Sequence, residues 1–303
     1  MCRLFGMSGG PNQVRATFWL LEAPDSLAQQ SRREPDGTGL GTFDAAGRPV
    51  VSKQPLAAYQ DQAFAHAARE RCSHTFVAHV RYASTGGLTA VNTHPFEQRG
   101  RMFAHNGVIG DLPRLDSELG DAGQLVQGQT DSERFFALVT REIERTGDIG
   151  EGITSAAQWI SEQLPVFALN CVLITPSELW ALRYPDTHEL HVLQRAAGGP
   201  SGSRHLDHAS ARGSVRVRSG DLASAPAVVV ATEPMDEDPG WRALGPGQLL
   251  HVDENLNVDV RTALEHPPAH LLTLQDLDPR AAASQSADKP AERPAERPAE
   301  RPS

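Results

Sequence analysis

The segment Thr75-Phe-Val-Ala-His-Val-Arg-Tyr82 predicts the strand from which the rest of the fold can be worked out. It is rich in β-branched and aromatic residues, which favour strands. Residues 101–104 are predicted to form a partner strand for it. Farther along, residues 131–145 carry apolar side chains at i, i+3 and i+4, the pattern of an amphipathic helix. This part of the chain therefore combines strands with a long helix.

The flanking segments extend this pattern in both directions. Toward the N-terminus we expect a strand at 3–8, a helix at 14–32 interrupted near Pro24, and a helix at 60–71. Toward the C-terminus, a helix at 153–164 is followed by predicted strands at 167–175, 178–183, 189–194, 215–218, 227–231 and 248–252. Strands near both ends with helices between them predict an α+β fold with layered sheets.

Composition excludes several classes of protein. The chain has 303 residues, with 28 Lys and Arg against 38 Asp and Glu, and a formal net charge of −10. This acidic balance argues against a dedicated nucleic-acid binder. No run approaches the length of about 18 apolar residues that a membrane span needs, and no basic leader precedes an apolar segment. We therefore expect a cytoplasmic protein without nucleic-acid or membrane partners.

The C-terminal residues differ in composition from the rest. From Lys289 the sequence repeats Pro-Ala-Glu-Arg nearly to its end. Proline at this spacing removes helical hydrogen bonds, and no large apolar side chain is available to bury. We expect residues 276–303 to form a disordered tail. No linker is visible before it, which predicts one domain over residues 2–275.

Cys2 is the first candidate for chemistry. Met1 is normally removed when the second residue is small, and the mature chain would then carry a thiol and a free α-amino group on one residue. An α-amine has a pKa of about 8, which suits a general base. Nucleophile and base would share a residue, as in N-terminal nucleophile enzymes. Taken alone, a Met-Cys start is more often incidental. Cys72 and Cys171 are expected to be buried and structural.

Arg81 ends the predicted strand and is followed by Tyr-Ala-Ser84-Thr85-Gly-Gly87. A guanidinium beside backbone donors at a strand end suits a carboxylate, which it can bind with two hydrogen bonds. The alternative interpretation is an ordinary surface arginine.

Two further clusters each have a chemical and a structural interpretation. Asn106-Gly107 is either a turn after a strand or an oxyanion hole made by the Asn106 amide and the Gly107 N–H. In Gln129-Thr-Asp131-Ser-Glu133, the carboxylates either cap a helix or leave Asp131 to bind a substrate ammonium. The histidines of this region lack the spacing of a metal-ligand set, so no metal is expected.

Taken in order along the chain, these residues belong to a series of motifs: Cys2-Arg-Leu-Phe-Gly6, Pro35-Asp-Gly37, His79-Val-Arg81, Asn92-Thr-His-Pro95, His105-Asn-Gly107 and Thr130-Asp-Ser-Glu133. This series resembles the class II glutamine amidotransferase domain of the N-terminal nucleophile hydrolase superfamily, over about residues 2–260. It is most similar to the stand-alone group that includes the γ-glutamyl hydrolase of ergothioneine synthesis and the amidotransferase-like subunit of glutathione degradation. One departure concerns the loop before the second strand, where the family often reads Arg-Gly-Pro-Asp-Gly and this sequence has Glu34 in place of the first glycine.

The resemblance implies a four-layer αββα sandwich, in which two antiparallel sheets are flanked by helices. It assigns Cys2 as the nucleophile, with Asn106 and Gly107 as the oxyanion hole. It assigns the substrate's α-carboxylate to Arg81, with Ser84 and Thr85 nearby, and its α-ammonium to Asp131.

The implied activity is that of a cysteine amidohydrolase. It would cleave a γ-glutamyl amide, in glutamine or a γ-glutamyl metabolite, through a thioester and without a cofactor or metal. One alternative is a glutaminase subunit that supplies ammonia to a separate synthase, and another is a non-catalytic binding protein with the same fold. The expected partners are accordingly a small γ-glutamyl substrate and either a synthase or a second copy of the chain.

Overall fold

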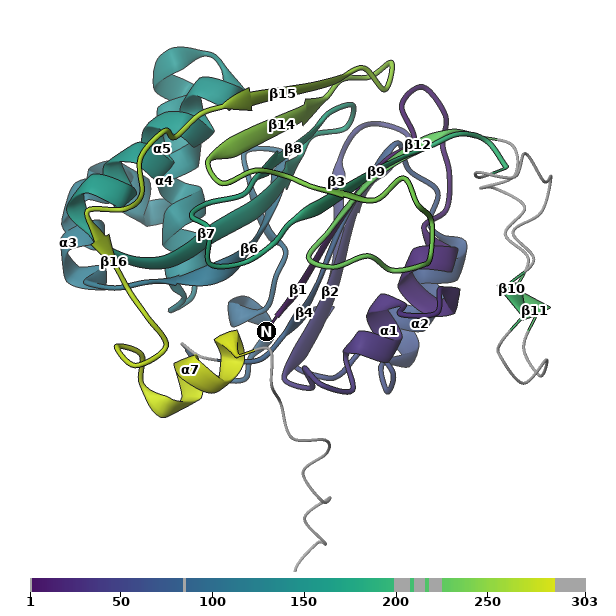
Figure 1. Cartoon of the computed structure of the whole chain (residues 1–303), viewed down its shortest axis with the longest axis horizontal. Helices are drawn as coiled ribbons and strands as arrows, with labels where there is room; N and C mark the ends of the chain where they lie inside the picture. Colours follow the sequence, from purple (N-terminus) through teal and green to yellow (C-terminus); the bar gives the residue numbers. More distant parts are fainter. Residues whose placement is uncertain (1, 84–85, 199–207, 210–215, 218–224, 287–303) are drawn as a thin grey trace, which may run out of the picture.

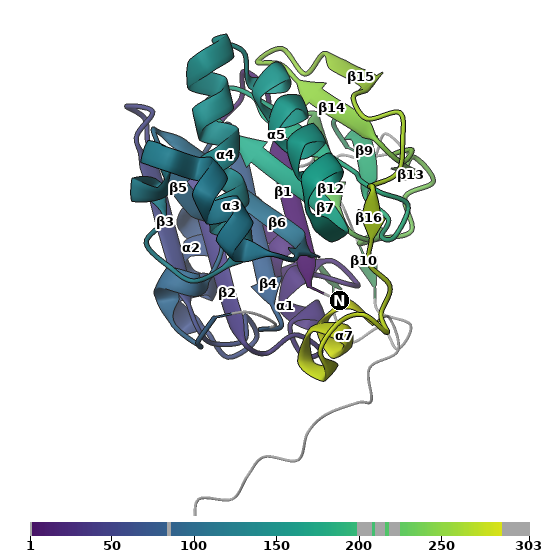
Figure 2. The ribbon, with the colours of Figure 1, turned by 90° about the vertical axis from the view of Figure 1, so that its left-hand side faces the viewer.

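The computed structural model describes residues 2–83, 86–198, 208–209, 216–217 and 225–286. Within these residues, two largely antiparallel sheets face each other, and helices cover the outer face of each sheet (Figures 1 and 2). The predicted α+β class and the four-layer αββα sandwich are therefore confirmed.

The first sheet has the order β13-β9-β12-β1-β4-β2-β3, and every neighbouring pair is antiparallel. In the central strand, Arg3 lies opposite Val80 and Phe5 lies opposite Ala231. This register brings the start of β1 beside the end of β4. The strands are β1 (Arg3–Ser8), β2 (Gly37–Phe43), β3 (Pro49–Gln54), β4 (Thr75–Arg81), β9 (His191–Arg195), β12 (Ala227–Ala231) and β13 (Arg242–Ala243).

The second sheet has the order β15-β14-β8-β7-β6-β5, and the short strand β16 adds to β7 in parallel. Its longest contact is the antiparallel pair of β6 and β7, which runs from Met102 opposite Ile174 to Ile109 opposite Val166. The strands are β5 (Phe96–Gln98), β6 (Arg101–Ile109), β7 (Pro165–Ile174), β8 (Leu179–Leu182), β14 (Gln248–Val252), β15 (Val258–Thr262) and β16 (His270–Leu271). A separate pair is formed by β10 (His208–Ala209) and β11 (Arg216–Val217).

The helices divide between the two outer faces. The first sheet is covered by η1 (Phe18–Glu22), α1 (Leu27–Gln30) and α2 (Gln62–Glu70). The second is covered by α3 (Leu112–Leu119), η3 (Gly120–Leu125), α4 (Asp131–Thr146) and α5 (Ile149–Gln163). Two short elements remain. In chain order, η2 (Ala90–Asn92) lies between β4 and β5, and α7 (Pro279–Gln285) follows β16.

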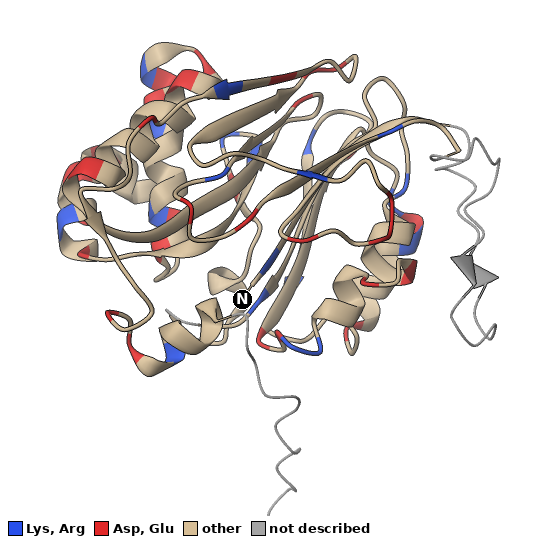
Figure 3. Ribbon diagram, viewed as in Figure 1, with Lys and Arg blue, Asp and Glu red and all other residues tan. Residues whose placement is uncertain are grey.

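Each interface between layers has its own apolar core. Trp19 and Phe76 lie in the core under the first group of helices, and Phe103 and Ile160 in the core under the second. A third core, which includes Val77, joins the two sheets. Burial of this apolar surface is the main favourable contribution to folding. The charged residues lie largely on the helices and loops outside (Figure 3).

The residues at its two ends explain where helix α4 begins and ends. Thr130 is the N-cap, and its Oγ1 accepts a hydrogen bond from Glu133 N at 3.2 Å. Asp131 and Glu133 place negative charge in the first turn, where the helix dipole stabilises it. Gly147 ends the helix with φ 75°, a left-handed conformation that glycine adopts readily. The helix predicted at 131–145 is therefore confirmed and is one residue longer.

Some predictions of elements are wrong. Residues 101–104 belong to β6 in the second sheet, whereas β4 pairs with β1 and β2 in the first, because two facing sheets offer each strand more than one partner. The expected helix at 14–32 is replaced by the short η1 and α1, since Val14 instead bridges to Ser73. Cys72 is exposed, while Cys171 is buried as expected.

The predicted disordered tail also needs correction at its start. Residues 279–285 form α7, which Pro279 can begin because a helix needs no N–H hydrogen bond at its first position. Asp278 caps this helix by accepting from the N–H groups of Arg280 and Ala281 at 2.9 and 3.0 Å. The Pro-Ala-Glu-Arg repeats lie outside the described residues.

Candidate active site

One pocket brings together side chains from both sheets and from the start of α4. It is lined by Cys2, Arg81, Asn106, Gly107 and Asp131, which the sequence had singled out. Ser84 and Thr85, predicted to lie nearby, fall outside the described residues. The remaining lining residues are His79, Tyr82, His94, His105, Thr130, Ser132 and Gln285.

Cys2 lies at the start of β1, against the end of β4. Tyr82 N donates a hydrogen bond to Cys2 Sγ at 3.2 Å, and the thiol lies 3.5 Å from Tyr82 O. These two contacts hold the Cys2 side chain against the end of β4. The side chain is buried but borders the pocket, so the sulfur is positioned to meet a bound ligand.

Arg81 is a buried cation, so the interpretation as a surface arginine is wrong. Burial lowers the pKa of its guanidinium, while the nearby Cys2 and Asp36 raise it. One nitrogen, Nη1, donates to Gly87 O at 3.2 Å. Asp36 holds the same strand end in place, because its N–H donates to Arg81 O at 3.0 Å and its carboxylate accepts from Ala83 N at 3.0 Å. The arrangement suits an anionic ligand group.

Asn106 and Gly107 lie within β6, so the interpretation as a turn is wrong as well. Asn106 Nδ2 donates to Cys2 O at 2.9 Å, which links the second sheet to the start of β1. An amide nitrogen carries two N–H groups, so a second donor is left for a ligand. At Gly107, an added Cβ would lie 1.8 Å from Ala168 O. Only glycine allows β7 to approach this closely.

Asp131 projects from the first turn of α4. Its Oδ2 accepts a hydrogen bond from Ile109 N at 3.0 Å, which fixes the carboxylate against the end of β6. The residue is 3% exposed and lines the same pocket as Arg81. The pocket therefore presents a carboxylate and a guanidinium, the pair of charges that complements the zwitterionic end of an amino acid.

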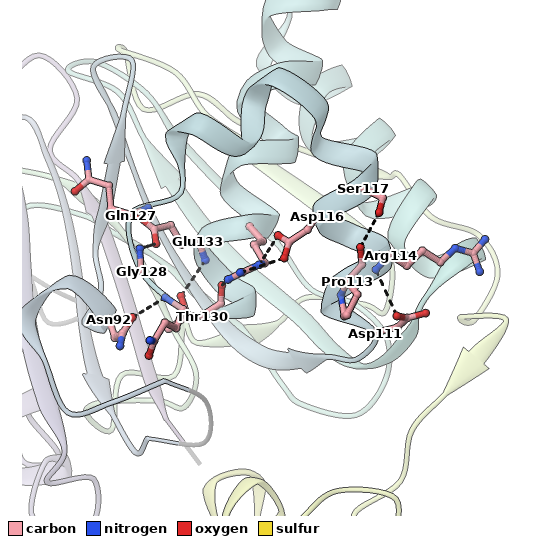
Figure 4. A network of polar contacts seen from close by, with 12 residues as sticks. Asn92, Asp111, Pro113, Arg114, Asp116, Ser117, Gln127, Gly128, Thr130 and Glu133 are labelled. Atoms are coloured by element: carbon pink, nitrogen blue, oxygen red, sulfur yellow. Dashed lines mark hydrogen bonds and ion pairs between the residues drawn. The ribbon is translucent and has the colours of Figure 1, made fainter.

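A polar network holds the loop that precedes α4 (Figure 4). Glu133 accepts from Gln127 N at 3.1 Å and from Gly128 N at 2.6 Å. Asn92 Oδ1 accepts from Gln129 N at 2.8 Å, and its Nδ2 donates to Gly87 O at 3.2 Å. Gly87 O also accepts from Arg81, so this network connects Arg81 to the loop that precedes α4.

Three buried histidines lie beneath these groups. The rings of His79 and His94 are 4.2 Å apart, and burial, together with the Arg81 charge, lowers the pKa of His79 to about 3. His105 contacts Ser132 Oγ at 2.9 Å and Ala168 O at 3.1 Å. In the part of the chain that the structure describes, no group of three or more His, Cys, Asp or Glu could hold a metal ion.

Gln285 is the pocket residue that lies farthest from any residue singled out in the sequence. It comes from α7, inside the segment expected to be disordered, and is 3% exposed. Tyr82 and Ser132 were also not singled out, although both are neighbours of predicted residues. No pattern in the sequence could have identified Gln285, because its place in the pocket depends on contacts with residues distant in the chain.

Comparison with known proteins gives a consistent result. Residues 1–271 match the family described as Glutamine amidotransferases class-II. The chain is similar to the gamma-glutamyl-hercynylcysteine sulfoxide hydrolase of Mycobacterium tuberculosis, with 28% identity over 265 residues that cover 84% of this chain and 94% of that protein. The glutamine–fructose-6-phosphate aminotransferase of Escherichia coli K12 is 31% identical over 134 residues, 44% of this chain and 22% of that enzyme.

A solved structure resembles the fold. The glutamine phosphoribosylpyrophosphate amidotransferase from B. subtilis superposes with a TM-score of 0.59 at 19% identity, over 88% of this chain and 50% of that one. The chain thus spans half the length of that enzyme. Separately, none of the helices among the described residues is long and apolar enough to cross a membrane.

Proposed function

The chain belongs to the class II glutamine amidotransferases, and on that premise we propose that it hydrolyses a γ-glutamyl amide through a thioester on Cys2. Membership makes the protein an enzyme that cleaves carbon–nitrogen amide bonds, which leaves the non-catalytic alternative without support. The thioester mechanism rests on the pocket. It brings together the thiol of Cys2, the guanidinium of Arg81, the carboxylate of Asp131 and the side-chain amide of Asn106 on β6.

The substrate's glutamyl end is recognised by charge. Arg81 binds the α-carboxylate and Asp131 the α-ammonium. Both charged groups are buried, which strengthens their interaction with a ligand that displaces water. A glutamyl group held at this end presents its γ-carbonyl toward Cys2. An unblocked γ-linked glutamyl group is therefore the part that all substrates share.

The first half of the reaction forms the thioester. We place the working N-terminus at Cys2, after removal of Met1, so that the Cys2 α-amine takes the thiol proton. Sγ attacks the γ-carbon, the C–S bond forms, and the carbonyl electron pair moves onto oxygen. Asn106 Nδ2 and the Gly107 N–H donate to this oxyanion. As the oxyanion collapses, the C–N bond breaks and the leaving nitrogen takes the proton from the Cys2 α-ammonium.

The second half releases glutamate. Water adds to the thioester carbonyl while the α-amine takes a proton from it, and the same donors hold the second oxyanion. The C–S bond then breaks, sulfur regains the proton, and glutamate leaves. The similarity to a protein named as a γ-glutamyl hydrolase supports water as the acceptor. We assign this chemistry to one catalytic domain over residues 2–275.

The test begins with the intact mass of the purified protein, which we expect to lack Met1. Cys2→Ala should then lower glutamate release from glutamine and from γ-glutamyl compounds by a factor on the order of 10⁴ or more, as for loss of a nucleophile. Cys72→Ala is the matched control, because Cys72 is exposed and does not line the pocket. Retained activity in Cys2→Ala, or a retained Met1 in the active protein, contradicts the mechanism.

The synthase-subunit alternative predicts a different result. In that case glutaminase activity would be weak in the purified chain and rise strongly when a partner synthase is added. Steady glutamate release by the chain alone favours the hydrolase.

A further inference from the structure

Helix α7 contributes to the pocket although it lies beyond the residues that match the family. The family match covers residues 1–271, whereas α7 spans Pro279–Gln285. The helix lies beside the start of β1 in both views of the ribbon (Figures 1 and 2). Gln285, its last residue, lines the pocket together with Cys2. This element therefore adds a residue to the pocket from beyond the family match.

One tie holds the end of α7 near Cys2. Gln285 Oε1 lies 2.8 Å from His188 Nε2, and both side chains are buried. Burial lowers the pKa of His188 to about 4, so the ring is neutral near pH 7, and its Nε2–H donates to the amide oxygen. Gln285 Nε2 donates in turn to Ser284 Oγ at 3.0 Å. The orientation of the Gln285 amide is thus determined.

A second tie holds the beginning of α7 near Arg81. An Arg280 nitrogen lies 3.9 Å from Asp36 Oδ2, the carboxylate oxygen that also accepts from Ala83 N. The Arg280 charge is close enough to lower the pKa of Arg81, in addition to the larger effect of burial. The helix therefore extends from the side of Arg81 to the side of Cys2.

The inner face of α7 is buried between these ties. Ala281 and Ser284 are 3% and 0% exposed, and Ala282 and Ala283 are partly exposed. Small residues let the helix approach the pocket closely. Because Gln285 lines the same pocket as Cys2, a large group on the γ-nitrogen of a substrate would meet the helix.

We propose that α7 is a size filter, with Gln285 as a specificity-determining residue, that restricts the leaving group of the γ-glutamyl amide to ammonia or a small amine. This inference rests on the proposed function and narrows its substrate class. It predicts that glutamine is cleaved in preference to γ-glutamyl compounds with bulky nitrogen substituents.

The experiment compares kcat/KM for glutamine with kcat/KM for a γ-glutamyl anilide. Deletion of residues 279–303 should raise the anilide-to-glutamine ratio about tenfold or more, a size typical of relieving a steric block in a pocket. Deletion of 287–303, which keeps α7, is the control and should leave the ratio unchanged. Equal ratios in the two deletions overturn the proposal.

Point variants repeat the test in the full chain. They show whether the result depends on α7 even if the protein without residues 279–303 misfolds. Gln285→Ala should raise the ratio about threefold to tenfold, with activity on glutamine much less affected. Gln275→Ala removes the same side chain at an exposed position outside the pocket and serves as the control. A Gln285→Ala variant that changes both substrates equally, or neither, contradicts the assignment.

A labelling measurement separates this inference from the proposed function. Cys2 is alkylated with iodoacetamide or with a bulky maleimide, and the modified peptide is identified by mass. The 279–303 deletion should speed the maleimide reaction at Cys2 selectively, with exposed Cys72 as the internal reference. Selective labelling without hydrolysis of any γ-glutamyl compound supports the steric role and rejects the proposed function. Hydrolysis without selective labelling or a change in ratio rejects the filter alone.

Discussion

Two sides of the pocket are held by different kinds of interaction. Cys2, Arg81 and Asn106 come from the ends or middle of β1, β4 and β6, whose backbones are fixed by the hydrogen bonds of neighbouring strands. Gln285 comes from α7, a helix of seven residues tied by the Gln285–His188 hydrogen bond and the Arg280–Asp36 pair. The groups proposed for chemistry are thus built into the sheets. The group proposed for selectivity is attached by side chains and can change without disturbing them.

After loss of the nucleophile in Cys2→Ala, the largest effect is expected at the oxyanion hole on the sheet side. Asn106→Ala should lower kcat by a factor on the order of 10² to 10³, because a preorganised donor to the oxyanion is lost. Steady-state kinetics on glutamine measures this. Alkylation of Cys2 by iodoacetamide should change much less, since the nucleophile remains. A kcat within about threefold of wild type would mean that Asn106 has only the structural role of binding Cys2 O.

The next effect tests how closely the neighbouring strands β6 and β7 approach each other at the site. Gly107→Ala should cost about 2 to 3 kcal/mol of unfolding free energy, because the new Cβ would lie 1.8 Å from Ala168 O and the strands must separate. Urea denaturation measures the change. Gly123→Ala is the control, since the nearest atom to its Cβ would be 4.0 Å away. Equal stability of both variants would show that β6 and β7 can adjust there.

The buried histidines make the sheet side sensitive to pH. Burial lowers the pKa of His79 from 6.5 to about 3, so as the pH falls below 6.5 the unfolded chain binds a proton that the folded chain does not. The contribution of neutral, buried His79 to the free energy of unfolding is therefore fully present above about pH 6.5. It decreases toward pH 3, by about 2 kcal/mol between pH 6.5 and 5.

His79→Phe keeps a ring against His94 and removes the titrating group, so its unfolding free energy should fall less steeply over this range. Urea denaturation at several pH values measures the slope. His66→Phe, at an exposed position, should keep the wild-type slope. Identical slopes in wild type and His79→Phe would remove His79 as the source of the pH dependence.

The smallest effect is expected at the outer tie of α7. Arg280→Ala should change the unfolding free energy by less than about 1 kcal/mol, because the pair with Asp36 is half exposed and screened. The anilide-to-glutamine ratio should rise by less than in Gln285→Ala. Arg48→Ala breaks the exposed pair with Asp44, which does not line the pocket, and should leave the ratio unchanged. A larger rise in the ratio for Arg280→Ala than for Gln285→Ala would show that the Arg280–Asp36 pair contributes more to selectivity than the Gln285 side chain.

The pocket residues could be predicted because their types and order carry chemical meaning. Cys2, Arg81, Asn106 and Asp131 each had a chemical and a structural interpretation, and the family resemblance favoured the chemical one. The fold brings all four to one pocket. The helix at 131–146 was predictable because its cap and its apolar spacing are both local. Gln285 was not, because its position depends on His188, far away in the sequence.

Strand β2 shows why other parts of the fold could not be predicted. Its sequence, Gly-Thr-Gly-Leu-Gly-Thr-Phe over Gly37–Phe43, is rich in glycine, which is depleted in strands. The structure explains the composition, since a Cβ at Gly39 would lie 2.0 Å from His94 O and one at Gly41 would lie 2.6 Å from Met102 Sδ. The glycines are needed by tertiary contacts that the sequence does not reveal. Local propensity therefore does not indicate this strand.

The central place of β1 in its sheet has a consequence for how the protein is made. The strand that begins next to Cys2 lies between β4 and β12, with Phe5 opposite Ala231. A growing chain on the ribosome cannot complete this arrangement until Ala231 has been synthesised and has emerged. The sheet that carries Cys2 and Arg81 is therefore completed only after most of the chain has been made, and Gln285 of α7 can join the pocket only later still.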